Sequence, residues 1–346
     1  MTKQLTNQTI GVGIIGINYF SSGQLNGLKN NGINIHGLLG NSTEITRDEI
    51  DELGIQILYE SIDDMLADSN IDVVHVVSSD HNYFTYIKAA LLAGKHIICE
   101  KPLMMSIEEV EELIQIATQK NLIHAINLNA RMYPFIELSR NMIQNGELGD
   151  LLIIQGTYEQ DQLGGLMDLA IYWLDLITFV TGLHVDEVFA DTKTFLPSEN
   201  KAEQQLEDFA AVILHFQHGV QGILGLSQIA AGRKDYLYFE INGSKGSVSW
   251  NAEKPNELWI GRTNEDNRIL VDVTPSMLME NQPSYPNETE QVTDTVTQFY
   301  SRVYETILSG DQSKPPQFPN FFDGLYLIKL CDAIKKSGHD ETWVAI

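Results

Sequence analysis

The chain has 346 residues, 43% of them apolar, and a formal net charge of −25 at pH 7. This composition is that of a globular protein long enough for about two domains, and it excludes a disordered or collagen-like chain. The negative charge opposes binding to phosphate groups, so we expect no nucleic-acid partner and no membrane partner.

The two cysteines, Cys99 and Cys331, are too few for a disulfide framework. Residues 1–9 are polar and do not look like a secretion signal. No run approaches the roughly 18 apolar residues that a membrane-spanning helix needs. We therefore expect a cytoplasmic protein.

The first third of the chain alternates between short apolar runs and helical patterns. Strands are predicted at residues 10–17, 33–39, 71–77, 96–99 and 122–128. Helices are predicted at 20–30, after Ser61, at 82–93 and after Ser106, where Glu109 completes a capping box. This alternation indicates βαβ units and a parallel sheet, with a ligand site at the carboxyl ends of the strands.

After Arg131 the pattern becomes that of helices and an antiparallel sheet. Strands are predicted at 151–158, 185–195, 209–216, 220–229, 236–241, 247–250 and 257–261. Helices are predicted from Arg131 to about 144 and at 165–180, 293–308 and 322–335. His218–Gly219 and Asn242–Gly243 are interpreted as hairpin turns, and residues 264–291 as loop.

The predicted fold class is therefore α/β. A doubly wound parallel sheet occupies residues 1–128 as a dinucleotide-binding domain, and residues 129–346 form an α+β domain with a large, mostly antiparallel open sheet. In an alternative arrangement, the last helices pack back on the first domain.

The pattern Gly11-x-Gly13-x-x-Gly16 matches the dinucleotide fingerprint as text, but its register is wrong. The fingerprint belongs to the turn after the first strand, whereas Gly11 and Gly13 fall inside that strand. The candidate cofactor turn instead starts at Gly16 and continues through Ile17, Asn18 and Tyr19. It could offer helix N-terminal amides to a phosphate, and the alternative is a plain strand-to-helix turn.

The end of the second strand carries Asn41 and Ser42 as candidate cofactor contacts. An acid that would bind the ribose 2′-hydroxyl of NAD is absent there, and Arg47 is near enough in sequence to favour a 2′-phosphate. The sequence leaves NAD and NADP both open.

Several segments, in the same order along the chain, resemble the Gfo/Idh/MocA oxidoreductases, the family of glucose–fructose oxidoreductase and inositol dehydrogenase. The strongest is Ala89–Pro102, which ends in Glu100-Lys101-Pro102. The others are Asn129–Pro134 (N-x-R-x-x-P), Gly164–Tyr172, Gly243–Ser247 and Asp323–Gly324.

This resemblance implies a Rossmann domain, a sheet-rich second domain and NAD(P)-linked oxidation or reduction of a sugar, cyclitol or related alcohol or carbonyl compound. It also implies a homodimer or homotetramer that assembles through the second sheet.

The resemblance assigns catalysis to Lys101, Asp168 and Tyr172. Asp168 and Tyr172 are four residues apart on a predicted helix and share a face. Many family members have histidine at the position of Tyr172, but a subset similar to dihydrodiol dehydrogenase has tyrosine. We expect Tyr172 to act as the acid/base, Lys101 as its electrostatic partner and Asp168 as the residue that orients it.

Further candidates follow from the same resemblance. Glu100, Lys101, Ser78 and Tyr83 are expected to contact the cofactor, although the Ser78–Tyr83 loop departs from the family pattern. Asn129, Arg131, Asp168 and Tyr172 are expected to contact the substrate. For Arg131 the alternative is an inter-domain salt bridge.

The scattered histidines suggest no metal site. Because the glycine turn, the ribose position and the Ser78–Tyr83 loop all depart from the family pattern, a second reading stays open. It is a ligand-binding or regulatory protein on the same fold that has lost catalysis.

Overall fold

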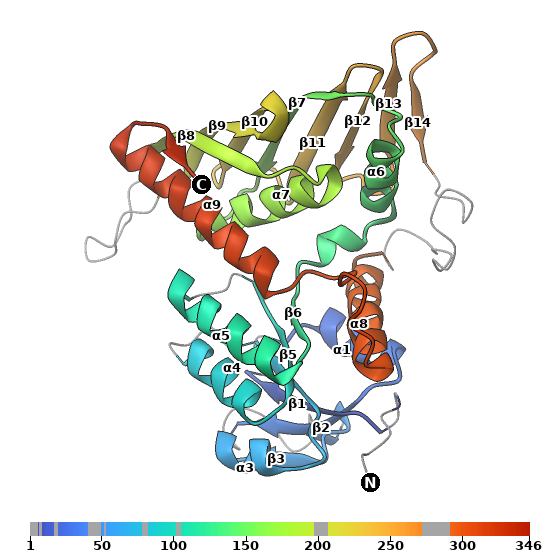
Figure 1. The fold of residues 1–346 in the computed structure, drawn as a ribbon, viewed down its shortest axis with the longest axis vertical. Helices are drawn as coiled ribbons and strands as arrows, with labels where there is room; N and C mark the ends of the chain where they lie inside the picture. Colours follow the sequence, from blue (N-terminus) through green and yellow to red (C-terminus); the bar gives the residue numbers. More distant parts are fainter. Residues whose placement is uncertain are drawn as a thin grey trace. The chain divides into compact units, whose positions relative to one another are not determined.

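The fold is described from a computed structural model of the chain, which covers residues 6, 9–16, 20–40, 50–51, 53–77, 82–101, 105–196, 207–271 and 291–346. The chain divides into two compact units (Figure 1). The first combines residues 1–129 with 289–325, and the second combines 130–288 with 326–346. Each unit has its own sheet and its own buried core.

The first unit contains a six-stranded sheet in the order β3-β2-β1-β4-β5-β6, with every neighbouring pair parallel. The strands are β1 (Gly11–Ile15), β2 (Asn34–Leu39), β3 (Ile57–Tyr59), β4 (Val73–Val76), β5 (His96–Cys99) and β6 (His124–Ile126). The sequence analysis missed only β3, which is three residues long. Strand order reverses between β1 and β4, and ligands of such sheets bind at this reversal.

Helices cover both faces of this sheet (Figure 1). They are α1 (Ser22–Asn30), α3 (Ile62–Ala67), α4 (Tyr83–Leu92), α5 (Ile107–Lys120) and α8 (Gln291–Ser309). The predicted capping box of Ser106 and Glu109 begins α5. Gly27 lets α1 pack closely against α8, because an added Cβ would lie 3.0 Å from Tyr300 and Val296.

The glycines of β1 serve close packing. A Cβ on Gly11 would lie 1.6 Å from the carbonyl oxygen of Asn70, and one on Gly13 would lie 2.0 Å from the Met65 side chain. Both residues are inside the buried strand. This confirms that the text match to the dinucleotide fingerprint is out of register.

The second unit contains a nine-stranded sheet in the order β14-β13-β12-β11-β7-β10-β9-β8-β15. Only the β7–β10 pair is parallel among these neighbours. The strands are β7 (Leu151–Glu159), β8 (Val185–Lys193), β9 (Phe209–Phe216), β10 (Gln221–Ser227), β11 (Tyr236–Gly243), β12 (Gly246–Asn251), β13 (Leu258–Arg262), β14 (Arg268–Leu270) and β15 (Val344–Ala345). The two sheets together confirm the predicted fold class.

Two local predictions in this unit are wrong. Asn242 and Gly243 belong to β11, and the hairpin turn lies at Ser244 and Lys245. Gly243 is needed inside the strand because a Cβ there would lie 2.2 Å from the carbonyl oxygen of Leu148. The segment predicted as loop at 264–291 contains β14.

Helices α6 (Pro134–Gln144) and α7 (Leu166–Thr181) lie on one face of the nine-stranded sheet (Figure 1). Two short 3₁₀ helices, η2 (Asn129–Met132) and η3 (Gln217–Gly219), and the long α9 (Phe321–Asp340) complete the elements. His218 and Gly219 have positive φ angles, which confirms the predicted turn between β9 and β10. No helix in the described residues is both long and apolar enough to cross a bilayer.

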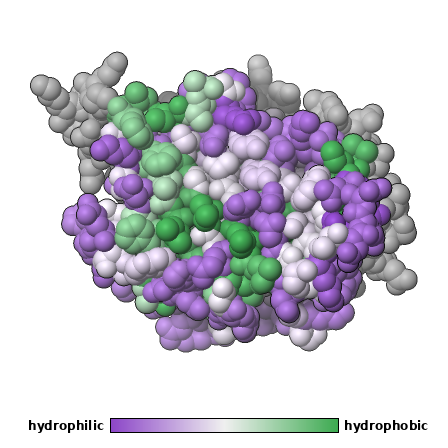
Figure 2. All heavy atoms as spheres, turned by 90° about the horizontal axis from the view of Figure 1, so that it is seen from above, coloured by the Kyte–Doolittle hydropathy of each residue, from purple (hydrophilic) through white to green (hydrophobic). Residues whose placement is uncertain are grey.

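The other face of the nine-stranded sheet exposes apolar side chains. Ile223 of β10 lies directly opposite Ile213 of β9, and both are exposed. In the view of Figure 2, hydrophobic residues gather near the middle of the visible face and hydrophilic residues surround them.

Candidate active site

One group of candidate residues, in the first unit, lies at the carboxyl edge of the parallel sheet. Gly16 follows β1 with a φ of 89°, a backbone conformation that glycine adopts without strain. Helix α1 then begins at its N-cap Ser21, whose hydroxyl accepts a hydrogen bond from the backbone of Gln24. The first turn of α1 is therefore ordered and directs helix N-terminal amides toward this edge.

Six predicted cofactor contacts lie outside the described residues: Ile17, Asn18, Tyr19, Asn41, Ser42 and Ser78. Arg47 and Pro102 lie outside them as well. Gly16, Tyr83, Glu100 and Lys101 are described, and all four lie at or near the carboxyl ends of parallel strands.

Glu100 is the centre of a largely buried polar network. Its Oε1 atom accepts a hydrogen bond from Asn127 Nδ2 over 2.8 Å and another from Gln24 Nε2. Gln24 Oε1 in turn accepts the backbone N–H of Ser21 over 2.6 Å. One carboxylate oxygen thus connects the first turn of α1 with the ends of β5 and β6.

Burial raises the pKa of Glu100 from 4.5 to about 7. The hydrogen bonds from Asn127 and Gln24 and the positive charge of Lys101 oppose this rise because they favour the carboxylate. Glu100 therefore changes its charge near neutral pH, a behaviour that is more frequent at functional sites than elsewhere.

Tyr83 opens α4 with a buried side chain. Its hydroxyl donates a hydrogen bond to the backbone carbonyl oxygen of Glu100 over 2.6 Å. Burial raises the pKa of Tyr83 well above its usual value, so the hydroxyl stays a donor. Tyr83 holds the end of β5 in place, and its contact with a cofactor stays a prediction.

The sequence analysis missed Gln24 and Asn127. Gln24 carries a local signal, because a serine followed three residues later by glutamine forms a capping box. Asn127 is the first polar residue after a buried strand, which is a weak signal. Nothing in either segment predicts that both amides bind the same carboxylate.

A second group of candidate residues, in the second unit, lies on the N-terminal half of α7. Gly165 is the N-cap of this helix, and Asp168 folds back over it: a Cβ on Gly165 would lie 3.3 Å from the Asp168 carboxyl carbon. Tyr172 follows one turn later, as predicted. Both side chains are half-buried.

Tyr172 has aromatic and acidic neighbours. Its ring meets that of Tyr158 edge to face, with 6.0 Å between the ring centroids. The Tyr158 hydroxyl donates to Asp235 Oδ1 over 2.5 Å. Burial, followed by the charge of Asp235, raises the pKa of Tyr158 far above its usual value, so Tyr158 remains protonated.

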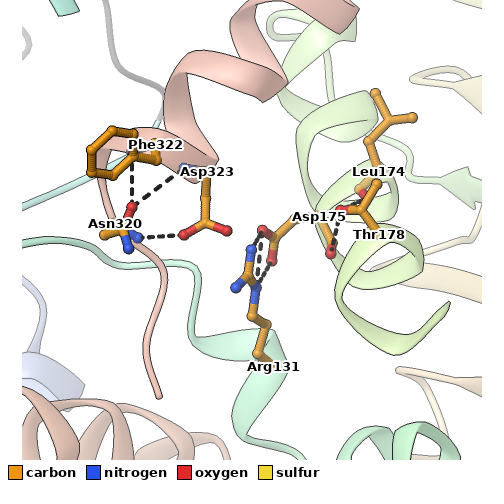
Figure 3. A network of polar contacts seen from close by, with 7 residues as sticks. All are labelled: Arg131, Leu174, Asp175, Thr178, Asn320, Phe322 and Asp323. Carbon is orange, nitrogen blue, oxygen red and sulfur yellow. Dashed lines mark hydrogen bonds and ion pairs between the residues drawn. The ribbon is translucent and has the colours of Figure 1, made fainter. Parts of the chain in front are cut away.

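Arg131 is buried inside the second unit, where it forms an ion pair with Asp175 of α7 (Figure 3). The Arg131 Nε atom lies 2.9 Å from Asp175 Oδ2 and 3.0 Å from Oδ1, and its Nη2 also donates to Oδ1. This partner is in the same unit, so the pair is not the inter-domain salt bridge that was the alternative. Substrate binding by Arg131 stays a prediction.

Asn129 is another predicted substrate contact. Its Nδ2 atom donates to Thr295 Oγ1 of α8 over 2.7 Å. Its substrate contact also stays a prediction. Among the described residues, no group of three histidine, cysteine or acidic side chains could hold a metal ion.

The strand order 3-2-1-4-5-6, with a glycine turn and an ordered helix N-terminus at the carboxyl edge, defines a dinucleotide-binding protein. Two family models match this chain. One is described as an oxidoreductase family with an NAD-binding Rossmann fold and matches residues 10–128. The other is described as the GFO/IDH/MocA C-terminal domain and matches residues 136–249.

Named relatives agree with these models. Levoglucosan dehydrogenase of Pseudarthrobacter phenanthrenivorans is 26% identical over 333 residues, which cover 82% of each chain. Myo-inositol 2-dehydrogenase of Thermotoga maritima is 27% identical over 212 residues, 58% of this chain and 63% of that protein.

Solved structures share the fold. Levoglucosan dehydrogenase in complex with NADH and levoglucosan has a TM-score of 0.85 at 24% identity, covering 97% of this chain and 99% of that one. An inositol dehydrogenase homologue from Azotobacter vinelandii, with NADH and myo-inositol, has a TM-score of 0.83 at 19% identity, covering 98% of each.

The chain belongs to the GFO/IDH/MocA family of oxidoreductases. This confirms the family that the motifs indicate, and with it an NAD(P)-dependent enzyme class and an NAD-binding first domain.

Proposed function

We propose that the protein is an NAD(P)-dependent dehydrogenase of a sugar, cyclitol or related polyhydroxylated compound, with Tyr172 as the acid/base. The observation that carries this proposal is that Asp168 and Tyr172 share one face of α7, with Tyr158 beside Tyr172 and hydrogen-bonded to Asp235. The substrates in the names of the relatives, levoglucosan and myo-inositol, support the substrate class.

The residues at the carboxyl edge of the parallel sheet fit a dinucleotide. Gly16, with its positive φ, leaves room for a close approach of phosphate, and the capped first turn of α1 supplies N–H donors. Glu100 is an acceptor suited to a ribose hydroxyl. A bound nicotinamide would take up the hydride from the carbinol carbon, or deliver one to a carbonyl carbon.

The protein's own part of the reaction is to move a proton. When the carbinol C–H bond breaks and the C=O bond forms, the hydroxyl proton must leave, and Tyr172 is proposed to accept it. A phenol has a pKa of about 10, so a neighbouring cation must lower that pKa, and Lys101 is the proposed cation. Asp168 is proposed to orient the pair.

The Tyr158–Asp235 hydrogen bond supports the choice of Tyr172 over its neighbour. Because the pKa of Tyr158 is raised so far, its phenol cannot act as a base near neutral pH. We infer that Tyr158 is a fixed donor that packs against Tyr172 and keeps it in position.

The first experiment is a titration of ligand-free protein with NADH and with NADPH, followed by the fluorescence of the reduced nicotinamide. We expect micromolar binding of one of the two, and its identity distinguishes NAD from NADP. Turnover of levoglucosan, myo-inositol and related polyols is then measured with the oxidised cofactor. A folded protein that binds neither cofactor would contradict the dehydrogenase proposal and favour a regulatory role.

Catalysis by Tyr172 is tested with Tyr172→Phe, which removes only the hydroxyl. We expect kcat to fall by about 10²- to 10⁴-fold, with NADH binding unchanged. Tyr238→Phe is the matched control, because the Tyr238 hydroxyl donates to Glu240 on β11 and is not part of the proposed site. Lys101→Ala is expected to lower kcat as well. Full activity in both Tyr172→Phe and Lys101→Ala would show that the assigned residues are wrong.

We also propose that two copies of the chain associate through the exposed face of the nine-stranded sheet, as the resemblance implies. The facing isoleucines Ile213 and Ile223 supply apolar surface for such a contact. Light scattering coupled to gel filtration is expected to give a dimer or tetramer, and Ile213→Lys with Ile223→Glu is expected to give monomers. A monomeric wild type would exclude this assembly.

A further inference from the structure

The hydrogen bond between Tyr158 and Asp235 has a fixed direction. Tyr158 lies near the end of β7, and its side chain is 7% exposed. Its hydroxyl donates to Asp235 Oδ1 over 2.5 Å, and a carboxylate accepts hydrogen bonds without donating them. The single hydroxyl proton of Tyr158 is therefore committed to Asp235, and the phenol oxygen can only accept from its other neighbours.

Tyr172 of α7 is the phenol whose ring contacts that of Tyr158. The two rings meet edge to face, with 6.0 Å between their centroids. Burial and then the charge of Asp235 are the main causes of the raised pKa of Tyr158. A charge on Tyr172 adds to this rise, ahead of a charge on Tyr133. Tyr172 is therefore the neighbour best placed to donate to the Tyr158 oxygen.

Asp235 connects this buried contact with the solvent. It immediately precedes β11, whose first residue Tyr236 pairs with Glu159 of β7. Unlike Tyr158, Asp235 is exposed, so its carboxylate exchanges protons directly with water. One end of the hydrogen bond thus lies beside the proposed acid/base, and the other end lies at the surface of the second unit.

The proposed reaction requires a connection of this kind. In each oxidation the substrate hydroxyl gives its proton to Tyr172, which must lose that proton before the next turnover. Tyr172 is already half-buried, and the binding of substrate and cofactor excludes water from an active site. A route through protein side chains lets the proton leave while the site is occupied.

We propose that Asp235 removes this proton from Tyr172 through Tyr158. The Tyr172 hydroxyl gives its proton to the Tyr158 oxygen while the Tyr158 proton passes to Asp235, which then releases it to water. Tyr172 becomes a phenolate again, Tyr158 is neutral before and after, and no electrons are exchanged. Carbonyl reduction uses the same steps in reverse. The inference rests on the proposed function, since it requires Tyr172 as the acid/base, and Asp235 itself touches neither substrate nor cofactor.

The other ionisable groups around this path leave it intact. Asp168 shares a face of α7 with Tyr172, and neither β10 nor β12 carries an ionisable residue. Burial and then the charge of Asp235 raise the pKa of Tyr133 to about 12, so that phenol stays protonated. The remaining charged residues belong to β7, β11 and the adjoining loops, and they are Glu159, Arg233, Lys234, Glu240 and Glu253. Among the described residues, Asp235 is the one that accepts the Tyr158 proton.

The test is Asp235→Asn, which keeps a hydrogen-bond acceptor for Tyr158 and removes the group that takes up the proton. The oxidation of levoglucosan or myo-inositol is measured. We expect kcat to fall by about 10-fold at neutral pH, with KM and the Kd for the reduced cofactor within about twofold of wild type. The loss should shrink toward about pH 10, where hydroxide takes the proton directly, and added imidazole should restore part of kcat at neutral pH.

Glu240→Gln is the matched control. Glu240 accepts the hydroxyl of Tyr238 over 2.8 Å, so it belongs to a second tyrosine–carboxylate pair on β11, away from Tyr172. Its replacement is expected to leave kcat and the pH profile unchanged. Asp235→Glu keeps the carboxylate, and we expect its kcat within about threefold of wild type.

Tyr158→Phe interrupts the same path at its middle. We expect the loss of kcat and the altered pH profile of Asp235→Asn, and a double variant no slower than the slower single variant. Thermal unfolding verifies that each variant is folded. If Asp235→Asn does not fold, the pH profile of Tyr158→Phe tests the same path.

Two results would overturn the inference. If Asp235→Asn keeps the kcat and pH profile of wild type while Tyr172→Phe is inactive, Asp235 carries no proton. A loss that is equal at every pH and that imidazole does not reduce shows a structural role only. In both cases the proposed function stands. A wild type that oxidises neither levoglucosan, myo-inositol nor a related polyol contradicts both proposals.

Discussion

Glu100 of the first unit and Asp175 of the second unit are two carboxylates that are largely withdrawn from solvent, and they have different kinds of partner. Asp175 of the second unit, 1% exposed, receives a guanidinium as its partner, with Nε of Arg131 within 3.0 Å of both its oxygens. Glu100 of the first unit receives two neutral amides at a single oxygen. Asp175 is hydrogen-bonded directly to a full charge, whereas the hydrogen bonds to Glu100 come from neutral amides and the charge of Lys101 acts beside them.

We expect this difference to separate a carboxylate with a structural role from one that can meet a ligand. A buried carboxylate that is fully paired with a guanidinium has little capacity left for a ligand. The amides of Asn127 and Gln24 and the charge of Lys101 offset the burial of Glu100 only in part, so its pKa rises to about 7. Both residues lie in segments that resemble the family's motifs, so the motifs alone do not distinguish their surroundings.

The largest expected effect comes from breaking the Arg131–Asp175 pair. Asp175→Asn removes the carboxylate charge that pairs with the buried Arg131 guanidinium, and we expect a loss of about 3–5 kcal/mol in the free energy of unfolding. Urea denaturation measures it. The control is Glu112→Gln, which breaks the more exposed 2.7 Å ion pair with Lys88 and is expected to cost under about 1 kcal/mol. Equal losses in the two variants would contradict the structural role of Arg131.

The second prediction concerns the pH dependence of the protein's stability. Because the folded protein favours neutral Glu100, its contribution to stability is complete below pH 4.5 and is lost as the pH rises through about 7. The size of the contribution is at most about 3 kcal/mol. Thermal unfolding of wild type and Glu100→Gln between pH 4.5 and 8 measures it. Wild type should lose more stability than the variant over this range, and parallel profiles would show that Glu100 does not titrate there.

The smallest predicted effect compares two serine caps. Ser21 and Ser106 each form a capping box, at the start of α1 and α5 respectively. Replacing either by alanine is expected to lower the free energy of unfolding by about 1 kcal/mol. Only Ser21→Ala should also weaken dinucleotide binding, by about two- to fivefold, because its box contains Gln24 and orders the amides of the α1 N-terminus. Equal dinucleotide affinities of the two variants would show that the α1 cap does not contribute to cofactor binding.

Patterns of local origin were predictable. The periodic alternation of strands and helices predicts the parallel sheet, and serine three residues before glutamate predicts the start of α5. Gly243 shows where local reasoning fails. An Asn-Gly pair favours a hairpin turn, but this glycine is required by the close approach of the Leu148 backbone, which is 95 residues away in the sequence.

By itself, the sequence determined the fold class, the family and the helix faces that carry Asp168 and Tyr172. The fold class and the helix faces follow from propensities and spacings that act within a few residues, and the family follows from the resemblance of the motifs. The tertiary structure was needed to show that Arg131 pairs with Asp175. It was also needed to show that the side-chain amides of Gln24 and Asn127 donate to the same oxygen of Glu100. Those residues come from different elements, and their partners depend on which polar groups burial brings together. Burial also sets the charge of Glu100, since desolvation is a property of the packed interior and not of the residue.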